Sequence, residues 1–170
     1  HRNFNRIDNF SAFLTASPAV GSWHPQLTVG VQKQWAKIEH NGETLQMDTP
    51  LFFCTLNNGI QLPYHWTLST DINFQSKGDY QNIYMYQNVF MMNATLTKSF
   101  LNEHLSIHLQ GIDLTHGRKD GNRIYNKHMN MDVANVSDSR ELRFTIRYKF
   151  NTAKSKYKGK GAATEEIKRL

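Results

Sequence analysis

The sequence predicts an all-β fold, an antiparallel up-and-down sheet of about seven strands that forms part of a transmembrane β-barrel. Three observations predict it. Apolar and polar residues alternate with a period of two, short and long connections alternate between the resulting strands, and aromatic residues gather near the strand ends. No segment shows a convincing 3.6-residue helical period.

The strands follow from rows of apolar residues on one parity and polar residues on the other. In the last strand, every even-numbered position is apolar and every odd-numbered position is polar or charged. Because successive strand side chains point to opposite faces, each row becomes one face of a sheet. The predicted strands are residues 10–17, 27–35, 52–62, 66–75, 92–100, 105–110 and 141–150. Residues that interrupt the rows are Phe13, Lys33, Asn58 and Lys98.

The connections between these strands are of two kinds. Three are short turns, at residues 21–25, 63–65 and 101–104. Three are polar and mostly longer, at residues 39–48, 77–81 and 116–139. The two kinds alternate strictly, so one end of the sheet is predicted to be tight and the other elaborated, as in outer-membrane barrels.

The aromatic residues favour a barrel whose apolar face points outward. Trp66 and Phe74 lie on one face eight residues apart, and Phe90 and Phe100 lie ten apart. At ~3.3 Å per residue and ~45° tilt, these spacings cover roughly 19 to 23 Å of the membrane normal. Asn, Gln, Thr and Ser on the other face suit a hydrated lumen. A soluble barrel or sandwich remains the alternative, because a soluble sheet alternates in the same way.

Composition excludes several classes of protein. Hydrophobic residues make up 39%, mean hydropathy is −0.60, and no run is apolar enough for a membrane-spanning helix. Aromatic residues at 12% and a net charge of +6 argue against disorder. Six basic and two acidic residues give residues 151–170 a charge of +4, and we expect a solvated periplasmic tail rather than a nucleic-acid-binding segment. A single cysteine excludes an intrachain disulfide.

Histidine and serine patterns do not predict an enzyme or a metal site. His104 and His108 share a strand face, but ~13 Å of strand separates them, too far for one ion. Ser106 and His108 form a Ser–His pair that is most simply structural. We therefore expect no catalytic residue, no metal and no cofactor.

Seven strands cannot close a barrel. Bacterial outer-membrane barrels have at least eight strands, and an unpaired edge in lipid leaves backbone groups without partners. Either an eighth strand lies between His116 and Ser139, or the first strand pairs with a segment upstream of His1.

Three segments resemble a known family. Residues 96–114 look like the penultimate hairpin of TonB-dependent outer-membrane receptors of the Bacteroidetes type, with a Lys-Ser-Phe-Leu turn. Residues 62–68 resemble the Leu-Pro…Trp turn of that family. Residues 140–150 are similar to its closing strand, which ends in Tyr-x-Phe, and the Lys-rich tail resembles its C-terminal tail.

The resemblance implies a 22-stranded barrel in the bacterial outer membrane, of which residues 1–150 would be roughly the last third. The C-terminus would be periplasmic. The plug domain and the segment that contacts TonB would lie upstream, and the solute is not identified. Two other functions stay open: a small complete eight-stranded barrel that acts as an adhesin or scaffold, and a soluble ligand-binding barrel.

The candidate ligand-binding residues lie in the last long connection and on the last strand. Loops carry specificity on a rigid scaffold, which favours Arg118, Lys119, Asp120, Arg123 and Tyr125. On the lumen-facing parity of the last strand, Arg143 and Arg147 could attract an anionic solute. We favour a structural role for them, pairing with acidic groups on a plug or on neighbouring strands.

Overall fold

The computed structural model describes residues 4–136 and 138–150. Within these ranges the chain forms twelve β-strands and no helix, and so no helix that could cross a membrane. In order they are β1 (Phe4–Ala16), β2 (Trp23–His40), β3 (Glu43–Met47), β4 (Leu51–Leu62), β5 (Trp66–Gln75), β6 (Gly78–Tyr80), β7 (Ile83–Met85), β8 (Val89–Phe100), β9 (Leu105–Ile112), β10 (Lys119–Tyr125), β11 (Asn130–Val136) and β12 (Glu141–Tyr148).

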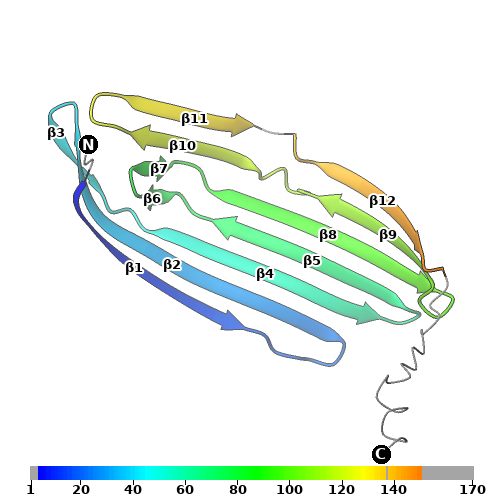
Figure 1. The fold of residues 1–170 in the computed structure, drawn as a ribbon. Helices are drawn as coiled ribbons and strands as arrows, with labels where there is room; N and C mark the ends of the chain where they lie inside the picture. The colour runs from blue at the N-terminus through cyan, green and yellow to red at the C-terminus, as the bar shows by residue number, and fades with distance from the viewer. Residues whose placement is uncertain (1–3, 137, 151–170) are drawn as a thin grey trace, which may run out of the picture.

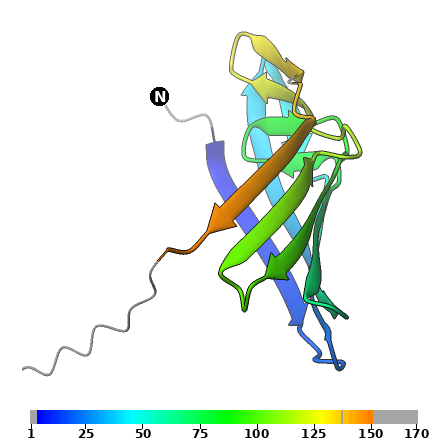
Figure 2. The ribbon, with the colours of Figure 1, turned by 90° about the vertical axis from the view of Figure 1, so that its right-hand side faces the viewer.

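Seven strands form one antiparallel sheet, here called the wall, in the order β1-β2-β4-β5-β8-β9-β12 (Figure 1). They are the seven strands predicted from the sequence, so the predicted all-β, up-and-down fold is confirmed. The wall curves, and its first and last strands bend to the same side (Figure 2). β1 and β12 are its two edges, and over the residues that the structure covers they do not pair with each other. The wall is therefore open.

The strand register carries one apolar face across the wall. Val29 pairs with Cys54, Cys54 with Phe74, and Phe74 with Phe90. Large apolar side chains are exposed on this face, among them Val29 at 38%, Phe52 at 51% and Phe90 at 45%, which a soluble sheet would bury. An apolar face on the outside and a polar face on the inside is the arrangement that lipid requires.

Lys98 interrupts the apolar face near its short-turn end and is accommodated by its neighbours. Its Nζ lies 5.1 Å from the centre of the Trp66 ring and 5.5 Å from that of Phe100. The same ammonium donates to the carbonyl oxygen of Tyr64 in the turn. The charge thus reaches the turn while the aliphatic stem lies along the aromatic rings, as lysines do at membrane interfaces.

Two of the other three interruptions, Phe13 and Asn58, have local explanations. Phe13 lies on the polar face opposite Gly30, and a Cβ at Gly30 would overlap the Phe13 ring, so the ring fills the space that the glycine leaves. Asn58 lies on the apolar face, where its amide donates to Thr70 Oγ1 at 3.0 Å and accepts from Trp23 Nε1 at 3.3 Å. Each polar group of the Asn58 amide therefore has a partner.

The long connections were predicted as polar loops, but they contain β3, β6, β10 and β11, and β7 lies just beyond the predicted connection at residues 77–81. β3 extends the far end of β2, and the other four form a second sheet in the order β11-β10-β7-β6. These five strands and residues 36–40 of β2 are here called the cap. Periodicity missed them because they are three to seven residues long. β10 and β11 do occupy residues 116–139, but they pair outside the wall and add no eighth wall strand.

The cap has its own core. Ala36, Ile38 and Met47 are buried, and Ile7, Leu45, Tyr84 and Tyr125 pack against them. On β2 the inward-facing positions change from polar to apolar at Ala36, because from there the strand packs on the cap instead of lining an open interior. The three long connections are thereby joined into one folded unit.

Hydrogen bonds fasten the cap to the wall and hold distant parts of the cap together. Gln34 donates to the Gln81 carbonyl at 2.8 Å and accepts from the Gln81 N–H at 2.6 Å. At the far tip, His40 Nδ1 lies 2.6 Å from the carbonyl oxygen of Asn126, and Asn41 N–H donates to the carbonyl of Lys127 at 2.8 Å. The tip of the β2–β3 hairpin is therefore tied to the turn between β10 and β11.

Candidate functional site

The site begins where the wall meets the cap, at the end of β9. Asp113 follows β9 in the left-handed conformation, with φ of 47° and a 2% exposed side chain. Its N–H donates to Asn93 Oδ1 at 2.9 Å. Its carboxylate accepts the Gly117 N–H at 2.8 Å and the Arg118 N–H at 3.3 Å, and it also accepts the Ser139 hydroxyl. Asp113 thus joins three segments: its backbone N–H holds β8, and its carboxylate holds the 113–118 loop and the connection before β12.

Asp113 lies beyond the last residue of β9, in the loop. Burial alone would raise the pKa of this carboxyl, but the hydrogen bonds from Ser139, Gly117 and Arg118 outweigh burial and hold the pKa below its usual value. The buried Asp113 carboxylate is therefore ionised, and its hydrogen bonds hold the loop and the connection before β12 in place. From the sequence its facing could not be decided, because the left-handed residue breaks the strand alternation.

The loop after Asp113 is seated directly on the end of β8. Leu114 N–H donates to the Met92 carbonyl at 2.8 Å, and Thr115 Oγ1 donates to the Phe90 carbonyl at 2.8 Å. A Cβ at Gly117 would overlap the Phe90 carbonyl oxygen and carbon, so only glycine fits there. This close seating fixes the direction in which the next residue, Arg118, leaves the loop.

Arg118 borders a pocket of about 510 Å³ between the polar face of the wall and the cap. That volume is within the usual range for small-molecule sites. The lining combines side-chain amides, thioethers and one guanidinium, from Gln75, Met85, Gln87, Val89, Met91, Arg118, Gly121 and Asn122. Gln75 donates to the Met85 sulfur at 2.8 Å, and a Cβ at Gly121 would overlap the Tyr86 ring, so both sides of the pocket are packed. The chemistry suits a polar or anionic solute.

A comparison with protein families explains the inverted faces of the wall. The family model described as the outer membrane protein beta-barrel family matches residues 1–148. The chain belongs to this family. No curated protein and no solved structure gives a significant match.

Membership of the outer membrane protein beta-barrel family assigns the faces of the wall. The protein is an outer-membrane barrel protein and contacts the outer-membrane bilayer. Its exposed apolar face is the lipid face, and its polar face is the lumen face. The pocket beside Arg118 therefore lies on the lumen side, beneath the cap.

The other candidates from the last long connection have different surroundings. Arg123 makes a two-pronged pair with Asp132 across β10 and β11, at 2.6 and 3.0 Å. Hydrogen bonds with Asp132 and Tyr125 raise the pKa of Arg123, and the hydrogen bond from Arg123 lowers the pKa of Asp132. The Tyr125 ring meets His40 edge-on at 5.6 Å and packs on the cap core. Lys119 and Asp120 belong to β10, and their side chains are outside the described part.

On β12, the two predicted arginines lie on the lumen face. Arg143 makes a two-pronged pair with Glu141 at 3.0 and 3.1 Å, a partner on its own strand, whereas the sequence predicted partners on a plug or on neighbouring strands. Positions i and i+2 share a strand face, which places the two groups side by side. Arg147 lies opposite Ser106 of β9.

The predicted Ser–His pair does meet. Ser106 Oγ lies 2.9 Å from His108 Nε2, and Thr97 Oγ1 lies 3.0 Å from His108 Nδ1. In a catalytic triad a carboxylate orients the histidine base, and here the Thr97 hydroxyl occupies that place beside His108. His104 instead approaches the Lys149 carbonyl at 3.4 Å. Among residues 4–136 and 138–150, no three His, Cys, Asp or Glu side chains gather as metal ligands would.

A second buried acid, Asp79, also holds the cap to the wall. Asp79 of β6 is 4% exposed, and its carboxylate accepts the Thr49 N–H at 2.8 Å while its own N–H donates to the Thr49 carbonyl at 2.9 Å. Burial raises the pKa of Asp79, and the hydrogen bonds from Thr49 only partly offset that effect. The contact anchors the β6–β7 hairpin beside the start of β4.

Proposed function

We propose that the chain is the C-terminal part of the barrel of a TonB-dependent receptor that takes up a solute across the outer membrane. The observation that carries the proposal is the open wall of seven strands beneath a folded cap. Lipid does not tolerate unpaired strand edges, so β1 and β12 require further strands on both sides. The resemblance of the hairpin and closing strand to TonB-dependent receptors supports 22 strands in total.

In this proposal the chain has a passive role and carries no catalytic step. The cap faces the cell exterior and forms part of the solute-binding mouth. The lumen face, with Arg143 and Arg147, contacts an upstream plug domain that TonB moves. Residues 1–150 form the barrel part, and residues 151–170, which lie outside the described structure, form a periplasmic tail.

Counting the strands of the native protein tests the proposal. We would purify the protein as the cell makes it from outer membranes, in detergent, and determine its structure by electron cryomicroscopy. A single chain with 22 strands and a plug in the lumen is expected. A closed barrel of eight strands without a plug would support the adhesin or scaffold function instead. Family membership disfavours the soluble barrel.

Replacing Arg118 with glutamine should weaken solute binding about tenfold, because the guanidinium is the one cation that lines the 510 Å³ pocket as described. A charge-assisted hydrogen bond contributes ~1.5–3 kcal/mol. The measurement is mass spectrometry of small molecules that co-purify with the native protein, followed by titration of the molecule identified. Arg140→Gln, in the connection before β12, is the matched control. Equal retention by the wild type and R118Q would contradict the role of Arg118.

A further inference from the structure

The lipid face carries a basic and aromatic patch at the cap end of β2. Lys33, Trp35 and Lys37 continue the row of Val31, so they share the lipid-facing parity. Register confirms this placement, because Lys33 pairs with Phe10 of β1 and Trp35 pairs with Asp8. The odd-numbered residues of β2 thus change from aliphatic to basic and aromatic as the strand leaves the apolar band.

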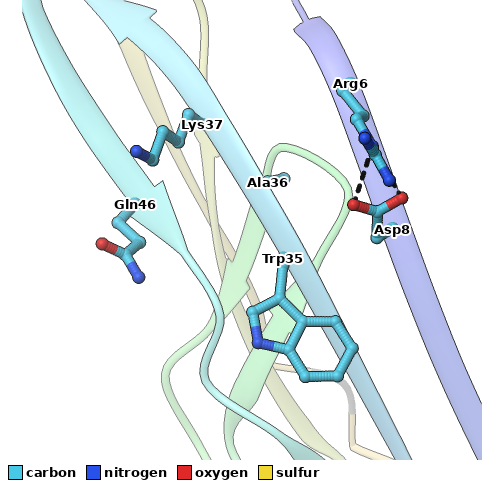
Figure 3. A pocket seen from close by; sticks show the side chains of 6 residues that line it. All are labelled: Arg6, Asp8, Trp35, Ala36, Lys37 and Gln46. Atoms are coloured by element: carbon cyan, nitrogen blue, oxygen red, sulfur yellow. Dashed lines mark hydrogen bonds and ion pairs between the residues drawn. The ribbon is translucent and has the colours of Figure 1, made fainter.

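The patch borders a groove of about 340 Å³ on the outer surface of β1, β2 and β3. Its lining residues are Arg6, Asp8, Trp35, Ala36, Lys37 and Gln46. Figure 3 shows Lys37 and Gln46 on one side, Arg6 and Asp8 on the other, and the Trp35 indole at one end. Trp35 is 46% exposed, although its indole is the largest apolar group in the groove.

The charges in the groove and beside it, at Lys33, are unbalanced. Arg6 is neutralised by Asp8, with an ion-pair distance of 2.8 Å. Lys33 Nζ lies 5.3 Å from the centre of the Trp35 ring. Among the ion pairs of the described residues, none involves Lys33 or Lys37. Two ammonium groups therefore flank an exposed indole without an anionic partner.

The height of the patch matches the headgroup layer. Val31 pairs with Phe52, which belongs to the aromatic row at the cap end of the wall. At ~3.3 Å per residue and ~45° tilt, Lys33 lies about 5 Å and Lys37 about 14 Å above Val31 along the membrane normal. Tryptophan and basic residues at this level anchor barrels to the polar region of a bilayer.

We propose that this groove binds the phosphorylated saccharide headgroup of a glycolipid in the outer leaflet. Lys33 and Lys37 pair with phosphate, and Trp35 covers the boundary between sugar and acyl chains. The Gln46 NH₂ donates to Asp48 at 2.8 Å, which leaves the Gln46 amide oxygen to accept from a sugar hydroxyl. The inference rests on the proposed orientation, in which the cap faces the cell exterior. It does not depend on which solute passes through the barrel.

Native mass spectrometry of the protein purified from outer membranes tests the proposal. The probes are bisphosphorylated lipid A, phosphatidylglycerol and inorganic phosphate. Lipid A should bind the wild type, and K33Q/K37Q should lower its occupancy at least tenfold. K33R/K37R keeps the charges and should bind like the wild type. The matched control is K77Q/R140Q, which removes two charges elsewhere on the cap side and should leave occupancy unchanged.

Each result bears on a different part of the proposal. If the wild type does not bind lipid A, the proposal is wrong. It is also wrong if K33Q/K37Q binds lipid A as well as the wild type does, while its heat-modifiable band on gels shows that it is folded. Equal binding of phosphatidylglycerol, or displacement of lipid A by inorganic phosphate, overturns the glycolipid as the source of the phosphate. The orientation of the cap is tested separately with Glu43→Cys and a thiol reagent that does not cross the membrane. Intact cells should label this variant more than the native protein, whose Cys54 gives the background. A strand number other than 22 in the native protein would contradict the proposed receptor function but would not change the lipid-binding result.

Discussion

Replacing Gly117 with alanine should remove most of the folded protein from the outer membrane. The new methyl group would overlap the carbonyl of Phe90, which is backbone of a wall strand and cannot rotate away. Either the 113–118 loop lifts off β8 or the end of β8 unpairs. Both lose the hydrogen bonds from Leu114 and Thr115, and we expect a cost of ~3–5 kcal/mol, at the upper end for single substitutions.

The measurement is the fraction of heat-modifiable, folded band in outer-membrane extracts, which should fall at least tenfold for G117A. Gly59→Ala is the matched control, because a Cβ at Gly59 in β4 would meet no atom within 4 Å. G59A should resemble the wild type. If both variants fold equally well, the close seating of the loop on β8 is wrong.

Asp113→Asn should loosen the junction between wall and cap by about 3 kcal/mol. The carboxylate accepts two backbone N–H groups and the Ser139 hydroxyl while buried. An amide of the same size turns its NH₂ toward one of these donors and leaves that donor without a partner, at ~1–3 kcal/mol in addition to the weaker bonds that remain. Limited proteolysis of the native protein in detergent should cut residues 113–118 faster in D113N.

Acid should produce the same loosening in the wild type. The pKa of Asp113 is lower in the folded protein than in the unfolded chain, so its contribution is fully present above the ordinary value of 3.8 and is lost as the pH falls below that value. Asp71→Asn, an exposed acid on β5, is the control and should not change the cutting rate. Equal proteolysis of D113N and the wild type at neutral pH would contradict the role of Asp113.

The wall could be predicted because lipid and lumen impose a strict period of two on every strand that crosses the membrane. The cap could not, because its strands are short and its core residues come from β1, β2, β3, β7 and β10. Ala36 and Ile38 continue the lumen-facing parity of β2, and only tertiary contact shows that they are core residues.

The candidate site was predicted only in part. Arg118 was selected as a loop cation, and it does line the pocket, but Arg123 and Tyr125 from the same segment hold the cap together. Gln75, Gln87 and Asn122 were missed, because amides are common on a lumen face and these three come from distant segments. Asp113 was missed as a junction, because hydrogen bonds to the backbone of a loop leave no periodic signal.

The tie between the tip of the β2–β3 hairpin and the turn after β10 has a mechanical consequence. His40 and Asn126 are 86 positions apart in the sequence, and their hydrogen bond fixes the distance between two remote parts of the cap. The three long connections cannot swing independently, because moving one pulls the others through the shared core. Any opening of this side of the barrel mouth must tilt the cap as a single rigid body, with its hinges where the cap meets the wall at Gln34, Asp79 and Asp113.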